Sequence, residues 1–202
     1  MKSKDTYKTI SKKAEGELFK DKNSKFIGFA FPVLNDNDIK LRIEAVKKEH
    51  HAARHWCYAY QIGTSEIVYR ANDDGEPSNS AGMPIYGQIK SFDVTNTLIV
   101  VVRYYGGVKL GVGGLINAYR TAAKSSLENA EIIEKTINTV FNLEFDYKHM
   151  SKVMRIIKEY RLNVLQQKLE HNCNLKISVR KSNAPEVFEI FNQFYQLEIS
   201  EL

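Results

Sequence analysis

The segment spanning residues 103–114 combines glycines with basic side chains, the residue types that bind anions. The basic residues are Arg103 and Lys109. The segment also contains five glycines, Gly106, Gly107, Gly111, Gly113 and Gly114. Glycine lets main-chain N–H groups face a phosphate at the positive end of a following helix. Tight turning and close packing without a ligand would need the same residues. The sequence also departs from the dinucleotide fingerprint, because Ile116 replaces its last glycine, and it lacks the Gly-Lys-Ser/Thr of a P-loop. Anion contact and packing therefore both remain open.

A second candidate site is the acidic loop at residues 72–79. The carboxylates of Asp73, Asp74 and Glu76 are of the kind that binds Mg²⁺ or Ca²⁺, but Asp-Gly is also a common turn pair and the spacing does not continue as an EF-hand. Ser78 stands where the first glycine of a G-x-S-x-G elbow belongs, so Ser80 is predicted to cap a helix instead of acting as a nucleophile. We therefore predict no metal site and no catalytic serine here.

A third cluster is basic and consists of Lys47, Lys48, His50, His51, Arg54 and His55. Two histidines four residues apart suit zinc on a helix, but a helix is not expected to reach Trp56 and no third ligand is evident. Contact with phosphate, or a single histidine hydrogen-bonded at a domain edge, is favoured. His55 and Cys57 lie on one face of a predicted strand, so a Cys/His enzyme stays open as an alternative.

The elements that position these clusters follow from the apolar patterns. In the first half, strands are predicted at 7–14, 25–31, 56–62, 66–70 and 98–103, and helices near 39–50, 80–90 and 114–129. Asn37 or Asp38 is predicted to cap the first helix. In the second half the predicted order is strand 136–145, helix 148–160, strands 163–169 and 175–180, helix 184–195 and a terminal segment 197–202. This β-α-β-β-α-β order is ferredoxin-like.

Length and composition support two small domains. The chain has 202 residues, 43% of them hydrophobic, and a net charge of +5, which suits a globular protein with anionic partners. Its longest apolar run is far shorter than the roughly 20 residues that cross a bilayer. With two distant cysteines and no apolar signal segment, we expect a cytoplasmic protein without a membrane partner. The predicted domains are residues 1–133 and 134–202.

Three segments, residues 55–60, 73–85 and 101–111, together resemble the signatures of the IMPACT/YigZ family. The resemblance covers about residues 18–130. It implies an N-terminal domain similar to the second domain of ribosomal protein S5 and a C-terminal domain similar to domain V of elongation factor G, folds met in the translation apparatus. It also implies that the RWD domain, through which eukaryotic members restrain a kinase of translation initiation, is lacking. No catalytic residues are established for the family.

The favoured hypothesis is a non-enzymatic protein that binds RNA or the ribosome and regulates translation, with a protein of the translation machinery as a further partner. Its binding surface is predicted as a groove between the two domains, formed by the glycine-rich segment with Lys47, Lys48, Arg54, His55, Arg103, Lys109 and Arg120. Tyrosines near the basic groups, such as Tyr105 and Tyr119, suit either base stacking or the core. No cofactor is predicted.

Two alternatives remain beside this hypothesis. The first is a metal-dependent nucleotide-binding enzyme or hydrolase, in which the acidic loop holds a metal and the glycine-rich segment holds phosphate. The second is a structural protein that binds a protein partner and neither of these ligands.

Overall fold

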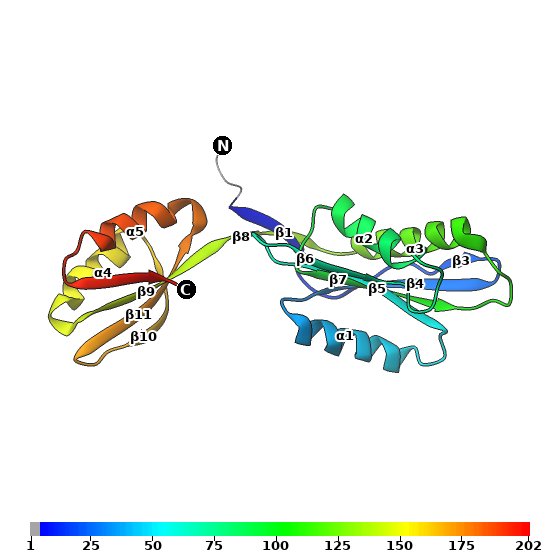
Figure 1. The fold of residues 1–202 in the computed structure, drawn as a ribbon, viewed down its shortest axis with the longest axis horizontal. Coiled ribbons are helices and arrows are strands. Elements are labelled where there is room, and N and C mark those ends of the chain that lie inside the picture. Colours follow the sequence, from blue (N-terminus) through cyan, green and yellow to red (C-terminus); the bar gives the residue numbers. More distant parts are fainter. Residues whose placement is uncertain (1–4) are drawn as a thin grey trace. The chain divides into compact units, whose positions relative to one another are not determined.

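The computed structural model describes residues 5–202, and these form two compact units. Residues 7–135 make up the N-terminal unit. Residues 136–202, joined by Asp5 and Thr6, make up the C-terminal unit. Each unit combines helices with its own β-sheet (Figure 1). This confirms the predicted α+β class and the two-part layout.

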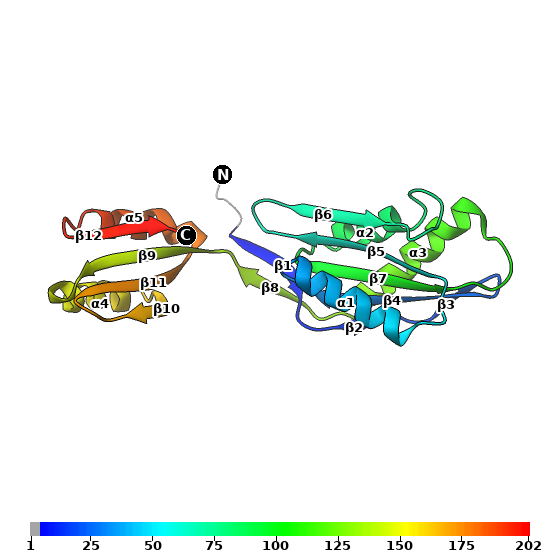
Figure 2. The ribbon, with the colours of Figure 1, turned by 60° about the horizontal axis from the view of Figure 1, so that its bottom comes forward.

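The N-terminal unit is built on an antiparallel sheet with the strand order β2-β4-β7-β5-β6, in which β3 also pairs with β4 (Figure 2). The strands are β2 (Ala14–Glu15), β3 (Phe19–Asp21), β4 (Ser24–Pro32), β5 (His55–Ile62), β6 (Val68–Asn72) and β7 (Thr97–Tyr104). The central strand β7 is buried from Thr97 to Arg103.

Helices cover both faces of this sheet, which is why β7 is apolar without alternation. Helix α1 (Asp36–Glu49) lies on one face, where Val100 and Val102 point. Helices α2 (Gly82–Ser91) and α3 (Gly111–Glu128) lie on the other, where Val101 packs (Figure 1). Within the described residues, no helix is long and apolar enough to span a bilayer.

Some predicted boundaries in this unit were wrong. The strand predicted at 7–14 is two strands, β1 (Thr6–Ile10) and β2, and β1 pairs with β8 (Ile132–Thr136), which the sequence did not reveal. Helix α1 is capped by Asn35, whose Oδ1 accepts a hydrogen bond from the Asp38 amide at 2.9 Å, and not by Asn37 or Asp38. Helix α3 begins at Gly111, three residues before the predicted start.

The C-terminal unit has the predicted β-α-β-β-α-β order. Its elements are β9 (Asn138–Asp146), α4 (Met150–Glu159), β10 (Asn163–Lys168), β11 (Asn172–Arg180), α5 (Ala184–Asn192) and β12 (Leu197–Glu201), with 3-10 turns η1 (Tyr147–His149) and η2 (Lys181–Asn183). The antiparallel sheet has the order β10-β11-β9-β12, so the terminal segment pairs with β9. Apolar residues of both helices and one sheet face form a separate core.

An ion pair ties the N-terminal end of the chain to this unit. Arg180 Nε donates to Asp5 Oδ2 at 2.6 Å and Nη2 donates to Oδ1 at 3.2 Å. These hydrogen bonds hold the pKa of Asp5 at about 2. The pKa of the Asp5 carboxyl is thus lower in the folded state than in the unfolded state, so its ionised form favours folding at neutral pH.

We expect Asp5→Asn to lower the urea midpoint of unfolding at pH 7 and to have a much smaller effect near pH 2. The stability that Asp5 contributes is present above about pH 4 and is lost as the pH falls toward about 2, because protonation removes the ion pair. Circular dichroism at both pH values measures the midpoints. Glu189→Gln, an exposed carboxyl on α5, is the matched control. An equal loss at both pH values would contradict the prediction.

Candidate functional site

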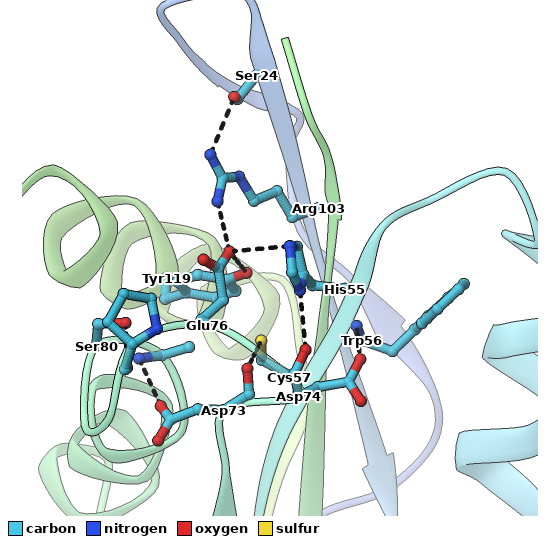
Figure 3. Close-up of polar contacts among 12 residues, drawn as sticks. Ser24, His55, Trp56, Cys57, Asp73, Asp74, Glu76, Ser80, Arg103 and Tyr119 are labelled. Atoms are coloured by element: carbon cyan, nitrogen blue, oxygen red, sulfur yellow. Dashed lines mark hydrogen bonds and ion pairs between the residues drawn. The ribbon is translucent and has the colours of Figure 1, made fainter. Parts of the chain in front are cut away.

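The candidate site is organised around a buried ion pair between Arg103 and Glu76. Arg103 lies near the end of β7, and Glu76 lies in the loop between β6 and α2. Arg103 Nη1 donates to Glu76 Oε1 at 2.6 Å, and the two side chains are only 5% and 4% exposed. The Tyr119 hydroxyl of α3 donates to the same carboxylate oxygen at 2.7 Å (Figure 3). Three segments distant in sequence therefore meet at one carboxylate.

The guanidinium of Arg103 also lies near two aromatic rings. It lies 5.5 Å from the ring centroid of Phe26 and 5.4 Å from that of Tyr105. Its Nη2 approaches Ser24 Oγ at 3.5 Å. Among the described residues, the buried Nε has no hydrogen-bond partner. Arg103, which the sequence analysis places in the predicted binding set, is thus a buried partner of Glu76.

His55, the first residue of β5, lies beside this ion pair. Its Nε2 is 3.9 Å from Glu76 Oε1, and its Nδ1 is 2.8 Å from the main-chain oxygen of Asp74. A carbonyl oxygen only accepts hydrogen bonds, so Nδ1 carries a proton and donates. The Asp74 carbonyl therefore fixes the orientation of the imidazole ring, with Nε2 directed toward Glu76.

The acidic loop uses its carboxylates to hold its own backbone. The Asp73 carboxylate accepts hydrogen bonds from the amides of Asn79, Ala81 and Gly82, each at 2.9 Å, and so caps α2. The prediction that Ser80 caps this helix was wrong, because Ser80 is buried and its Oγ donates to the Pro77 carbonyl at 2.6 Å. The cap comes from a residue nine positions before Gly82, a distance beyond local capping patterns.

Asp74 has an equally structural role. Its Oδ2 accepts from the Trp56 amide at 2.7 Å, which joins the loop to β5. With Asp73 bound to main-chain amides and Glu76 bound to Arg103, all three carboxylates that a metal would need already have partners. In the described part of the chain, no group of three or more ligating side chains is placed to hold a metal ion. Ser78 is exposed on the same loop.

Cys57 does not have the environment of a nucleophile. It is fully buried, and its Sγ donates to the Asp73 carbonyl at 3.0 Å (Figure 3). Burial raises the pKa of the Cys57 thiol well above its ordinary range. Because the thiolate is the reactive form, the Cys/His pair on β5 lacks the species that a Cys/His enzyme requires.

A pocket of about 730 Å³ opens beside the ion pair, within the N-terminal unit. Its polar lining consists of Arg54, His55, Glu76, Arg103, Tyr105 and Lys109, and Gly111 and Val112 of α3 complete one wall. The structure therefore brings together Arg54, His55, Arg103, Lys109 and Gly111 of the predicted binding set. All of these residues belong to the one unit, residues 7–135.

Other members of the predicted set lie elsewhere. Lys47 and Lys48 are in the last turn of α1, which covers the sheet face opposite to α2 and α3. Arg120 is exposed on α3 and does not line the pocket. The Gly106 amide donates to Ser24 Oγ at 3.1 Å, and a Cβ at Gly106 would lie 2.1 Å from the Asn23 carbonyl carbon. Gly106 therefore serves close packing.

The first turn of α3 borders the pocket, and its N-cap residue, Leu110, forms no side-chain cap hydrogen bond. Gly111 has a φ of +76° and Gly107 has a φ of +84°. Both values lie in the left-handed region that favours glycine. Gly113 differs, because its φ is not positive and a Cβ there would meet no atom within 4 Å. Neither packing nor backbone conformation requires glycine at this position.

The charge of the pocket favours anions. Its permanently charged lining residues are Arg54, Arg103 and Lys109 against the single carboxylate of Glu76. Since Arg103 is paired with Glu76, Arg54 and Lys109 remain as exposed cations beside the positive end of α3. The role of Tyr119 was missed from sequence, although its spacing from Leu115 and Ala122 places it on the buried face of a helix.

Comparisons with known proteins agree on one family. The model of the Impact N-terminal domain matches residues 22–127. The chain is 35% identical to IMPACT family member YvyE of Bacillus subtilis over 154 residues, which are 76% of this chain and 70% of the relative. It is 33% identical to IMPACT family member YigZ of Escherichia coli, covering 67% of this chain and 68% of the relative. A crystal structure of a hypothetical protein matches with a TM-score of 0.73 and 25% identity over 96% of each chain.

We expect Arg103→Ala to lower the free energy of unfolding by about 3–5 kcal/mol, because it leaves the Glu76 carboxylate buried without its cation. Urea unfolding followed by fluorescence of Trp56, the sole tryptophan, measures this loss. The double variant Arg103→Met/Glu76→Gln removes both charges and keeps an acceptor for Tyr119, so it should be more stable than Arg103→Ala. A double variant as unstable as the single one would show that the uncompensated charge is not the cause.

Proposed function

This chain belongs to the IMPACT family, and from that premise we propose that it is a non-enzymatic RNA-binding protein that regulates translation. The proposed contact surface is the pocket beside the first turn of α3, with Arg54 and Lys109 as phosphate ligands. The link to translation rests on the family. Resemblance to that family implies domain folds that are also met in the translation apparatus. The ribosome, which contains the largest RNAs of that apparatus, is the proposed place for such a contact.

The observation that carries the proposal is the convergence of two exposed cations and the first turn of α3 on one pocket. Arg54 precedes β5, Lys109 precedes α3, and the two come together only through the fold. Main-chain amides at a helix start and basic side chains are the groups that most often contact nucleic-acid phosphates. Both are present here without a competing exposed carboxylate.

Tyr105 adds a surface for bases. Its ring lines the pocket and is 46% exposed, while the Arg103 guanidinium supports it from the buried side. Aromatic rings beside a basic groove bind single-stranded nucleic acid by stacking, which tolerates any base. The combination supports binding of single-stranded RNA with little sequence preference.

Binding is favoured over catalysis for a reason that concerns the candidate catalytic groups themselves. The carboxylates of the acidic loop hold α2, β5 and Arg103, and the thiol of Cys57 is buried and protonated. The enzyme alternatives would need these same groups to be available for a metal or a substrate.

We expect Lys109→Ala and Arg54→Ala each to weaken the binding of a fluorescent single-stranded RNA and to reduce its salt dependence. Each lost phosphate contact should lower the slope of log affinity against log salt by about 0.7. Fluorescence anisotropy over a salt series measures both quantities. Because both side chains are exposed, stability should change by no more than about 0.5 kcal/mol.

Lys48→Ala is the control for these variants, since Lys48 is exposed on α1 at the opposite sheet face. It removes the same charge from the protein and should leave the affinity nearly unchanged. Binding that is absent, or that does not depend on salt, would refute the proposed function. An equal loss in Lys48→Ala would show a diffuse charge effect and no defined site.

We expect Gly113→Ala to stabilise the protein by up to about 1 kcal/mol, because alanine favours the helix, and at the same time to weaken RNA binding. Apart from its chain neighbours and the backbone of its own helix, the new methyl group meets no protein atom within 4 Å, so it should obstruct only an incoming ligand. Gly87→Ala is the matched control, since a Cβ in that part of α2 also meets nothing within 4 Å. It should stabilise without affecting RNA binding. Unchanged binding in Gly113→Ala would remove the first turn of α3 from the site.

A further inference from the structure

We infer that the outer edge of β6 joins two copies of this chain through an antiparallel pair of β6 strands related by a twofold axis. This edge belongs to the N-terminal unit and shares no residue with the pocket, so the inference does not depend on RNA binding. It follows from the unprotected state of the edge, from the apolar side chains along it and from a charge pattern that is complementary to itself.

Strand β6 is the last strand of its sheet, and β5 is its only partner among the described strands (Figure 2). The outward main-chain groups of such an edge can pair with a further strand, unless the edge is short, charged or irregular. Strands β2 and β3 at the other end have only two and three residues. In the C-terminal sheet, the register of β10 shifts between Val164 and Gln166, and β12 carries Glu198 and Glu201. By contrast, β6 pairs with β5 in unbroken register and contains no proline.

Three consecutive apolar residues are exposed at the start of this edge. Ile67, Val68 and Tyr69 are 48%, 55% and 53% exposed. The ring of Tyr69 is already held in place, because it stacks on Tyr86 of α2 with ring centroids 4.3 Å apart and 8° between the ring planes. The Tyr86 hydroxyl in turn donates to Gln61 Oε1 at 3.0 Å. Aromatic and β-branched residues on a fixed edge favour cross-strand pairing.

The charges beside these residues identify a second copy as the partner. Glu66 and Arg70 flank the apolar residues, both are exposed, and neither has an ion-pair partner among the described residues. Antiparallel pairing centred on Val68 of both copies places Glu66 opposite Arg70 of the second copy, and it places Ile67 opposite Tyr69. The register requires Glu66 and Ile67 to extend β6 by two residues at its start. The twofold axis repeats each contact, as in the commonest protein dimers.

The faces of the sheet agree with this register. Alternation places Ile67 on the same face as Tyr69, which stacks on α2. It places Val68 and Arg70 on the other face, and residues that oppose each other across two strands must share a face. A register centred on Arg70 would place like charges opposite each other, which is destabilising. A register centred on Tyr69 would place Val68 opposite Arg70 and leave Glu66 without a cation.

The test is sedimentation velocity of the full chain over a concentration series. We expect a monomer–dimer equilibrium that shifts to monomer on dilution, because a short strand pair forms a small interface. Val68→Lys should weaken dimerisation by about tenfold or more, since it places like charges opposite each other at the twofold axis. Leu41→Lys, the same kind of change at a 62% exposed position of α1, is the matched control and should leave dimerisation unchanged. Circular dichroism should show that both variants fold.

An exchange of charges tests the register. Glu66→Lys and Arg70→Glu should each weaken dimerisation by about tenfold, because each places like charges opposite at two symmetric positions. The double variant Glu66→Lys/Arg70→Glu should restore dimerisation, since opposite charges face each other again. A role of either residue in folding alone would not produce this recovery.

Every outcome decides for or against the inference. A chain that stays monomeric across the series would overturn it. A dimer that persists in Val68→Lys would place the contact at another surface and would also overturn it. A double variant as weak as the single variants would show that Glu66 and Arg70 do not face each other, which would overturn the proposed pairing. RNA binding is measured separately by anisotropy, so each of these results leaves the proposed function standing.

Discussion

The buried ion pair of Arg103 and Glu76 is the interaction on which the N-terminal unit depends. A charged pair in a site this buried is stable only when further hydrogen bonds satisfy its remaining groups. Tyr119 provides one of them from α3, and the loop that carries Glu76 is fixed by Asp73 and Asp74. The relative positions of β7, α2 and α3 are thus coupled through one carboxylate, and the pocket beside it is preorganised by the same contacts.

In this arrangement, one group of residues stabilises the fold and a different group is available to bind a ligand. The loop residues with the chemistry most suggestive of catalysis, Asp73, Asp74 and Glu76, are occupied in holding elements together. The groups that remain available are Arg54, Lys109, Tyr105 and the first turn of α3, which border the pocket without closing the core. A site of this kind can bind and orient an anion. Burial raises the pKa of the Cys57 thiol, which disfavours the reactive thiolate.

The glycine-rich segment shows that one composition can serve several purposes. Gly106 allows a close approach to the backbone of Asn23, and Gly107 and Gly111 adopt positive φ values. Gly113 has neither reason and costs helix stability relative to alanine. The sequence leaves open whether these glycines serve packing or anion contact. In the structure the answer differs from one glycine to the next. Close packing explains Gly106 and backbone conformation explains Gly107 and Gly111, whereas neither explains Gly113.

The sequence by itself determined the family, the α+β class, most helices and strands, and the β-α-β-β-α-β order of the second half, because these depend on local periodicity and on contiguous motifs. It missed β8 and the Asp73 cap, since both depend on partners distant along the chain. Only the tertiary structure decided which basic residues share a pocket. Lys48 and Arg54 are six positions apart, yet the sheet separates them, whereas Arg54 and Lys109 meet because β5 pairs with β7.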